Sequence, residues 1–170
     1  MYHERQKRMF CGIHSVNNFL QRNTYSKEIF DSIAERLVSE PPEEGMYRFN
    51  PHKTIFFGNY DANVIIEALR IEGYSTDWFP KRNPEKNLAV IFWEDDVRGI
   101  ILNKPTFWGR HWTCLRKDGS EGVSAVYHDS KCAEPVIFAT KEMADEFILN
   151  TVEQERDDEF FIVRVGGTNE

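Results

Sequence analysis

Residues 111–129 have the sequence HWTCLRKDGSEGVSAVYHD. Two strand-like runs, 111–117 and 123–129, flank the loop DGSEG, and an Asp-Gly pair in such a loop is typical of a β-hairpin. A hairpin symmetric about Ser120 places His111 opposite Asp129, where Cβ atoms lie ~4.5–5.5 Å apart. A carboxylate there can fix the imidazole tautomer and favour the imidazolium. An ordinary cross-strand surface pair explains these two residues alone equally well.

The rest of the chain divides into a helical first half and a strand-rich second half. Further strands are expected at 74–79, 88–92, 99–102 and 159–165. Helices are expected at 11–21, 27–38, 61–73 and after residue 140, with Ser26, Asp61 and Thr140 as N-caps. We expect Met143, Phe147 and Ile148 to face inward on the last helix. This order predicts an α+β fold, with helices packed beside an antiparallel sheet.

Composition narrows the class of protein. The chain has 170 residues with 41% hydrophobic and 29% charged residues, which fits one globular domain over 1–170. The net charge of −7 disfavours nucleic-acid binding, which needs a basic footprint. Modest acidity otherwise means solubility, or suits a basic partner.

The cysteines and histidines follow no disulfide or metal spacing. Three cysteines, an odd number, indicate a reducing compartment. We expect no metal ion and no cofactor. No apolar run approaches the ~20 residues of a membrane helix, and the first eight residues are too polar for a signal peptide. A monomer in the cytosol or the nucleus is therefore expected.

Cys11 stands where a polar leader meets the first apolar helical stripe. A helix N-terminus stabilises a thiolate, the form that attacks a carbonyl, although most free cysteines are small core residues. Among the histidines, His111 is the best candidate base because Asp129 can orient it; His128 would point to the other face of the strand. His14 would pack or cap, and His3 and His52 would lie on the surface. The Gln6 amide and the Cys11 backbone N–H could stabilise an oxyanion, although a lone glutamine among charged residues is usually solvated.

These residues fall in a familiar pattern of motifs. YHERQKRMFCGIHSVNNFLQ (2–21) resembles the opening of Josephin domains, and GNYDANVII (58–66) resembles their third-helix entry. HWTCLR (111–116) and YHDSK (127–131) resemble the strands that carry the histidine and the third catalytic residue. The resemblance spans about residues 2–165 and is closest to the short, stand-alone members. Two departures are Gly12, where alanine is common, and Asp129, which replaces the asparagine of some members.

The resemblance implies a papain-like fold and a thiol protease that cleaves after the C-terminal glycine of ubiquitin through a thioester. It assigns Cys11 as nucleophile, His111 as base, Asp129 as orienting acid and Gln6 as oxyanion donor. Ubiquitin and ubiquitinated proteins would be the partners. Residues 26–57 would form a helical arm or lid beside the cleft, or a plain surface loop.

The chemistry of the ubiquitin tail suggests a basis for specificity, and two alternative functions fit the same residues. The ubiquitin tail is basic and ends in two glycines, so a narrow slot could select it by exclusion. Trp112 and Trp108 could wall that slot, or both could be core residues. One alternative is a ubiquitin-binding module with weak or lost catalysis. Another is a thiol acyltransferase or amidase on a papain-like fold with a small-molecule substrate.

Overall fold

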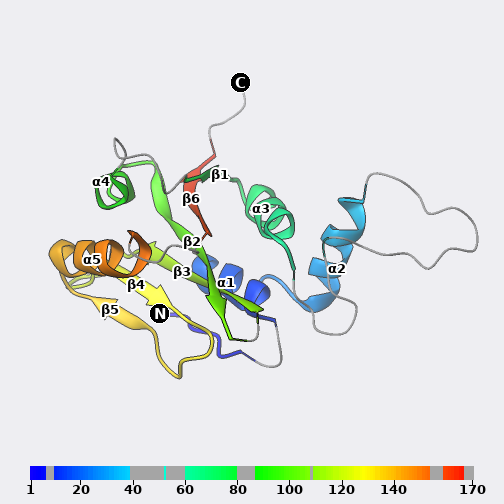
Figure 1. Ribbon diagram of the computed structural model, residues 1–170, viewed down its shortest axis with the longest axis horizontal. Helices are drawn as coiled ribbons and strands as arrows, with labels where there is room; N and C mark the ends of the chain where they lie inside the picture. The colour runs from blue at the N-terminus through cyan, green and yellow to red at the C-terminus, as the bar shows by residue number, and fades with distance from the viewer. Residues whose placement is uncertain are drawn as a thin grey trace, which may run out of the picture.

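The computed structural model describes residues 1–6, 10–38, 52, 60–79, 87–107, 109–153 and 159–166. Its centre is a sheet with the strand order β1-β6-β2-β3-β4-β5, and every neighbouring pair is antiparallel (Figure 1). The strands are β1 (Tyr74–Trp78), β2 (Val97–Thr106), β3 (Gly109–Lys117), β4 (Ala125–His128), β5 (Val136–Phe138) and β6 (Glu159–Val165).

Helices cover both faces of this sheet. They are α1 (Cys11–Leu20), α2 (Lys27–Arg36), α3 (Ala62–Ile71), α4 (Leu88–Phe92) and α5 (Lys141–Phe147), which continues as the π-helix η1 (Ile148–Glu153). Figure 1 shows α4 and α5 at one side of the molecule and α2 and α3 at the other. The predicted α+β class is confirmed.

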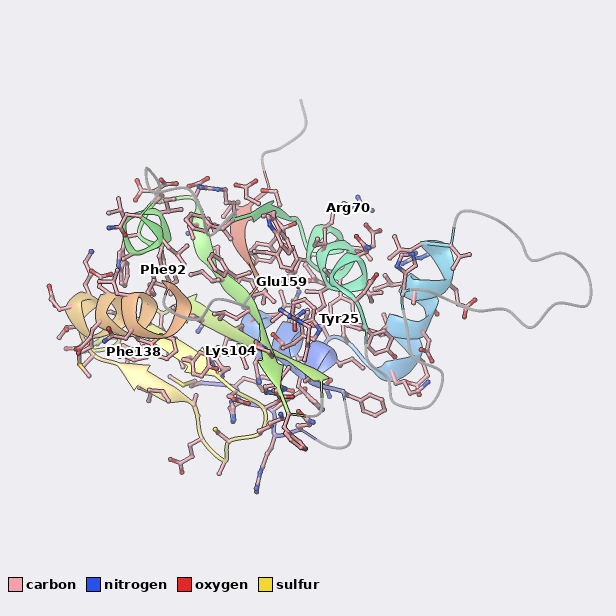
Figure 2. All side chains as sticks on the ribbon, in the orientation of Figure 1. Tyr25, Arg70, Phe92, Lys104, Phe138 and Glu159 are labelled. Carbon is pink, nitrogen blue, oxygen red and sulfur yellow. The ribbon has the colours of Figure 1, made fainter. Side chains whose placement is uncertain are left out.

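Two hydrophobic layers result because side chains alternate along each strand. Along β2, Ile101 packs in the layer formed with α1, α2 and α3, whereas Ile100 and Leu102 pack in the layer formed with α4 and α5. Phe92 of α4 and Phe138 of β5 belong to the second layer (Figure 2). The α1 layer is the one that holds the candidate site.

The predicted N-caps are confirmed. The Ser26 hydroxyl accepts from Ile29 N, Asp61 accepts from the amides of the first turn of α3, and the Thr140 hydroxyl accepts from Met143 N. Each side chain satisfies a helical N–H that has no carbonyl partner within the helix. Of the three residues expected to face inward on the last helix, Phe147 packs against the core and Ile148, at the start of η1, is fully buried. The expectation for Met143 is wrong, because it is 47% exposed.

The expected strand at 88–92 is wrong, because these residues form α4. The Asn87 side chain accepts from Val90 N and starts the helix, which buries Leu88, Ala89 and Phe92. Val90 is 65% exposed, so the segment has one apolar face despite its continuous apolar sequence. A run of five apolar residues suits a buried strand and a short helix equally well. Strand β5, at the sheet edge, was not predicted.

Much of the expected arm lies outside the described residues. Helix α2 forms its first part, whereas 39–51 and 53–57 belong to the part of the chain that is not described. The lid therefore stays a prediction.

Two glycines should respond in opposite directions to alanine. A Cβ on Gly12 would lie 3.5 Å from Trp112 Cδ1 and 3.6 Å from Ile65 Cδ1, which is ordinary van der Waals contact. We expect Gly12→Ala to raise the free energy of unfolding by about 0.5–1 kcal/mol, because alanine favours a helix. A Cβ on Gly99 would lie 2.4 Å from Leu115 O, so Gly99→Ala should lower stability by about 1–3 kcal/mol. Urea denaturation measures both, and a destabilised Gly12→Ala would contradict the packing described for α1.

Candidate active site

Cys11 is the first residue of α1 and is 5% exposed. Phe10 occupies the N-cap position without a side-chain hydrogen bond, and the first turn carries no acidic residue. The amide dipoles of the helix start therefore act on the thiol without a competing carboxylate in that turn. The helix begins here because Ile13, Val16 and Phe19 bury one stripe in the core.

Burial opposes ionisation of Cys11, but two contacts outweigh it. The His111 side chain and the backbone of Trp112 stabilise the thiolate form of Cys11. Although burial alone would raise it, these contacts hold the pKa of Cys11 below that of an ordinary thiol. The geometry therefore stabilises a thiolate at the end of α1.

His111 lies on β3, is 4% exposed and connects Cys11 to Asp129. Its Nε2 atom lies 2.7 Å from Asp129 Oδ1, which leaves Nδ1 as the ring nitrogen toward Cys11. Burial acts to lower the pKa of His111, yet the hydrogen bonds to Asp129 and Cys11 raise it above the ordinary value. A thiolate and an imidazolium thus stabilise each other.

Asp129 follows directly after β4 and is held by its own turn. Its Oδ1 atom also accepts from Lys131 N at 2.9 Å, and its carbonyl accepts from Cys132 N at 2.9 Å. Burial acts to raise the pKa of Asp129, but the His111 and Lys131 hydrogen bonds lower it below the ordinary value. The carboxylate therefore remains charged while it orients His111.

The predicted contact between His111 and Asp129 is present, but the predicted register is wrong. Cys114 pairs with His128 and Lys117 with Ala125, so the hairpin is symmetric about Glu121. The hydrogen bond from Val123 N to Ser120 O and a positive φ at Gly122 set this turn. Asp129 consequently reaches His111 diagonally from beyond the end of β4.

Gln6 is tied to the residue that follows Asp129. Gln6 N donates to Ser130 O at 2.6 Å, and the Ser130 hydroxyl donates to Gln6 Oε1 at 3.2 Å. Ser130 was not singled out from the sequence. The one sequence feature that could have indicated a role for Ser130 is its position directly after the candidate acid Asp129.

Of the two tryptophans that could wall a slot, the structure describes only Trp112. The Trp112 ring is 5% exposed, packs parallel to Phe161 and donates from Nε1 to Tyr60 O at 3.1 Å. Trp112 is therefore a core residue whose backbone, rather than its ring, contacts Cys11. Trp108 lies outside the described residues.

The remaining histidines have structural partners. His128 is fully buried on the α1 side of the sheet, near Gln21, and burial lowers its pKa to about 3. His14 hydrogen-bonds Glu4 at 2.6 Å. His3 was expected on the surface, but its ring stacks on His128 at 5.3 Å. His52, also expected on the surface, is half-buried and hydrogen-bonds Asp61 at 2.8 Å.

Within the described ranges, the structure contains no group of three or more His, Cys, Asp or Glu residues that could hold a metal ion. None of the helices that can be described is both long and apolar enough to span a bilayer.

Alkylation of Cys11 should remain fast below the pH at which an ordinary thiol, with a pKa of about 8.5, ionises. The pKa of Cys11 is lowered and that of His111 is raised because each charged form stabilises the other, so the thiolate forms at lower pH than in an ordinary thiol. Reactivity should be lost only as pH falls through the pKa of Cys11. Timed iodoacetamide labelling with mass spectrometry measures this profile.

His111→Ala should move the labelling profile of Cys11 to higher pH. Burial raises the pKa of the thiol, and His111 is the main group that opposes this effect. Cys114 is an internal control, since burial raises its pKa and it should stay unmodified. An unshifted profile in His111→Ala would contradict the pairing of these two groups.

The chain is similar to known proteins along most of its length. The Josephin family model matches residues 6–164. Josephin-2 of Homo sapiens is 36% identical over 148 residues, which cover 79% of this chain and 71% of the relative. A Josephin-like protein of Drosophila melanogaster is 34% identical over 180 residues, covering 96% of this chain and 73% of the relative. A Josephin-like protein of Arabidopsis thaliana is 34% identical over 152 residues, covering 81% of this chain and 41% of the relative.

Proposed function

Because the chain belongs to the Josephin family of papain-like deubiquitinating cysteine proteases, we propose that it hydrolyses the peptide or isopeptide bond after the C-terminal glycine of ubiquitin. The observation that carries this proposal is the grouping of Cys11, at the start of α1, with His111, whose Nε2 lies 2.7 Å from Asp129 Oδ1. A thiolate, an imidazolium and an orienting carboxylate are the parts that nucleophilic acyl transfer requires.

The mechanism follows from the position of each group. The Cys11 thiolate attacks the glycine carbonyl carbon, and His111 donates its proton to the leaving amine as the C–N bond breaks. The resulting thioester links Cys11 to ubiquitin. Neutral His111 then takes a proton from water, which attacks the thioester, frees the ubiquitin C-terminus and restores the thiolate–imidazolium pair.

Stabilisation of the oxyanion is assigned to Gln6 and to the backbone N–H of Cys11. The two tetrahedral intermediates place negative charge on the former carbonyl oxygen, and donors fixed in advance lower the barrier. Gln6 is anchored beside Asp129 through Ser130, and Cys11 N lies at the N-terminus of α1, whose first amides lack helical partners. Both donors are therefore held by elements that also carry the reacting groups.

A second candidate is supported by one observation. Cys11 and His111 are 5% and 4% exposed, so the reacting atoms are covered in this conformation. A ubiquitin-binding module with weak or lost catalysis would also show a covered pair. The two candidates differ in turnover, not in binding.

The test compares substrates. We expect purified protein to cleave a fluorogenic amide at the ubiquitin C-terminus and to leave a short peptide amide uncut. The net charge of −7 should favour encounter with the basic tail, so kcat/KM should fall as salt rises while kcat stays nearly constant. A substrate ending in alanine instead of glycine should be cleaved poorly, because a narrow slot excludes the added methyl group.

The outcomes separate the candidates. Binding of ubiquitin without turnover would identify the binding module. Salt-independent cleavage of short amides would instead identify an amidase with a small-molecule substrate.

A further inference from the structure

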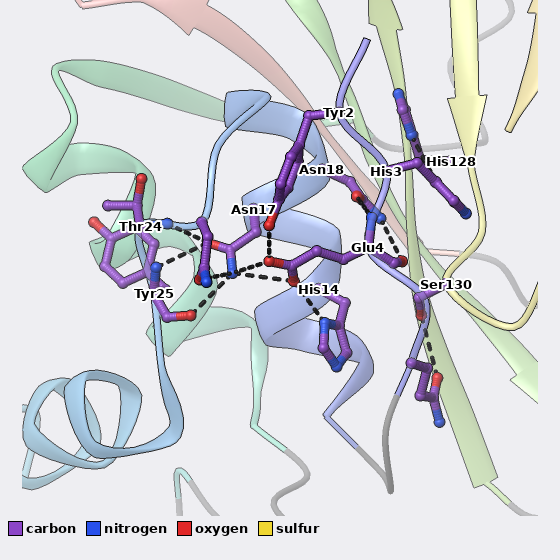
Figure 3. A network of polar contacts seen from close by, with 12 residues as sticks. Tyr2, His3, Glu4, His14, Asn17, Asn18, Thr24, Tyr25, His128 and Ser130 are labelled. Atoms are coloured by element: carbon purple, nitrogen blue, oxygen red, sulfur yellow. Dashed lines mark hydrogen bonds and ion pairs between the residues drawn. The ribbon is translucent and has the colours of Figure 1, made fainter. Parts of the chain in front are cut away.

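The N-terminal segment 2–6 lies along α1 and is held there by side-chain amides (Figure 3). Glu4 N donates to Asn18 Oδ1 at 2.5 Å, and Asn18 Nδ2 donates to Glu4 O at 3.3 Å. Gln21 makes the same pair of contacts with Tyr2, each at 3.0 Å. The amide side chains of Asn18 in α1 and of Gln21, the residue that caps its C-terminus, thus bind the backbone of the segment at every second residue, as a neighbouring strand would.

The Glu4 carboxylate fixes the segment a second time. It accepts from His14 Nδ1 at 2.6 Å, from Asn17 Nδ2 at 3.1 Å and from the Tyr2 hydroxyl (Figure 3). Burial acts to raise the pKa of Glu4, but these hydrogen bonds hold it below the ordinary value. The segment therefore keeps one register on α1, the helix that begins with Cys11.

The far end of the segment meets the exit of β4. Ser130 is 2% exposed and contacts Gln6 through both its backbone carbonyl and its hydroxyl (Figure 3). The hydroxyl donates to Gln6 Oε1, which identifies that oxygen as the accepting end of the amide. The donating end, Nε2, is consequently directed away from Ser130. In this orientation the buried hydroxyl holds the oxygen end of the Gln6 amide, whereas a half-turn of the amide would point the N–H₂ group at Ser130 instead.

We propose that Ser130 is a positioning residue that holds the Gln6 amide with its N–H₂ group toward the oxyanion. The inference rests on the proposed function and adds a residue to it. Without the hydroxyl, the amide can turn and present its oxygen to the developing negative charge, which removes a donor and adds repulsion. Since the oxyanion exists only after attack, the contact matters for the transition state and not for substrate binding.

A double-mutant cycle tests this inference with the fluorogenic ubiquitin amide. Removing an oxyanion donor typically costs about 10²–10³-fold in kcat, so we expect a loss of that order for Gln6→Ala. Ser130→Ala should lower kcat by about tenfold, with KM unchanged, because the amide still samples the productive orientation. In the Gln6→Ala background, Ser130→Ala should have no further effect, since there is no amide left to orient. Ser130→Thr, which keeps the hydroxyl, should retain most of the activity.

Two controls separate positioning from structural damage. Ser124→Ala removes a hydroxyl that donates to Ala139 O at 3.1 Å just before β4, and it should leave kcat unchanged. Ser130→Ala should also leave the pH profile of Cys11 alkylation unchanged, because Gln6 acts on the oxyanion and not on the thiolate. A shifted profile would mean that Ser130 acts through its neighbour Asp129, and the inference would be wrong.

The cycle also distinguishes the inference from the function on which it rests. If Ser130→Ala reduced kcat by the same factor with and without Gln6, the inference would fail while the proposed protease stood. A general loss of structure in Ser130→Ala would also reduce kcat by the same factor in both backgrounds, and it would therefore also contradict the inference. If Cys11→Ala kept full turnover, the proposed function itself would fail.

Discussion

Replacing Cys11 with alanine should abolish hydrolysis of the ubiquitin amide, with a fall in kcat of roughly 10⁴–10⁶-fold. The sulfur supplies the bond that forms in the first step, and neither His111 nor Asp129 can substitute for it. Labelling by ubiquitin carrying a C-terminal electrophile should disappear in parallel. Ubiquitin binding should persist, because one small, 5% exposed side chain is shortened and no contact surface is removed.

The other two cysteines provide matched controls for Cys11→Ala. Cys114 is fully buried and burial raises its pKa, so Cys114→Ala should keep the labelling. Cys132 is exposed and lies three residues after Asp129, which makes Cys132→Ala the more demanding control. If Cys11→Ala were still labelled, and if the labelling were lost only when Cys132 was also replaced, the nucleophile would be Cys132, in the turn after β4.

The parts of the fold that could be predicted from sequence are those fixed by local chemistry. Ser26, Asp61 and Thr140 cap helices because short polar side chains before an apolar stripe satisfy the first amides. Strand β6 likewise has the predicted bounds, Glu159–Val165, because apolar residues fill it almost continuously.

Long-range packing determined those elements that the sequence pattern did not predict. Residues 88–92 became α4 because Asn87 caps them and the α5 layer offers a surface for one apolar face. The hairpin register depended on a turn centred on Glu121, and an Asp-Gly pair does not fix the centre of a five-residue loop. The His111–Asp129 contact survived this two-residue shift because Asp129 lies beyond the paired part of β4 and can reach diagonally.

Two asparagines of α1 reflect the contact between this helix and the N-terminal segment. Asn17 and Asn18 are poor helix formers, yet they occupy the middle of an apolar helix. Such residues are retained where their amides have buried partners, and here those partners are the backbones of Glu4, before α1, and Tyr25, after it. The pair therefore indicated a buried polar network, although the sequence alone did not say which backbone it binds.

Asp129→Ala should lower kcat by roughly 10²–10⁴-fold and change KM little. The carboxylate makes a 2.7 Å hydrogen bond to His111 Nε2 and raises the pKa of the imidazole. Without it, the ring can rotate, and the imidazolium that must protonate the leaving amine loses its main support. Asp129→Asn should be milder, since an amide oxygen still accepts from Nε2–H but carries no charge.

Asp118 offers a matched control for this prediction, because it is a second partly buried carboxylate in a turn of the same hairpin. Asp118 accepts from Ser120 N at 2.8 Å, much as Asp129 accepts from Lys131 N at 2.9 Å, but it pairs with Arg116 instead of a histidine. Asp118→Ala should therefore lower stability without lowering kcat, whereas Asp129→Ala should lower kcat and shift Cys11 alkylation to higher pH. If both variants lost the same small amount of activity, Asp129 would only stabilise its turn, and His111 would be oriented by its burial alone.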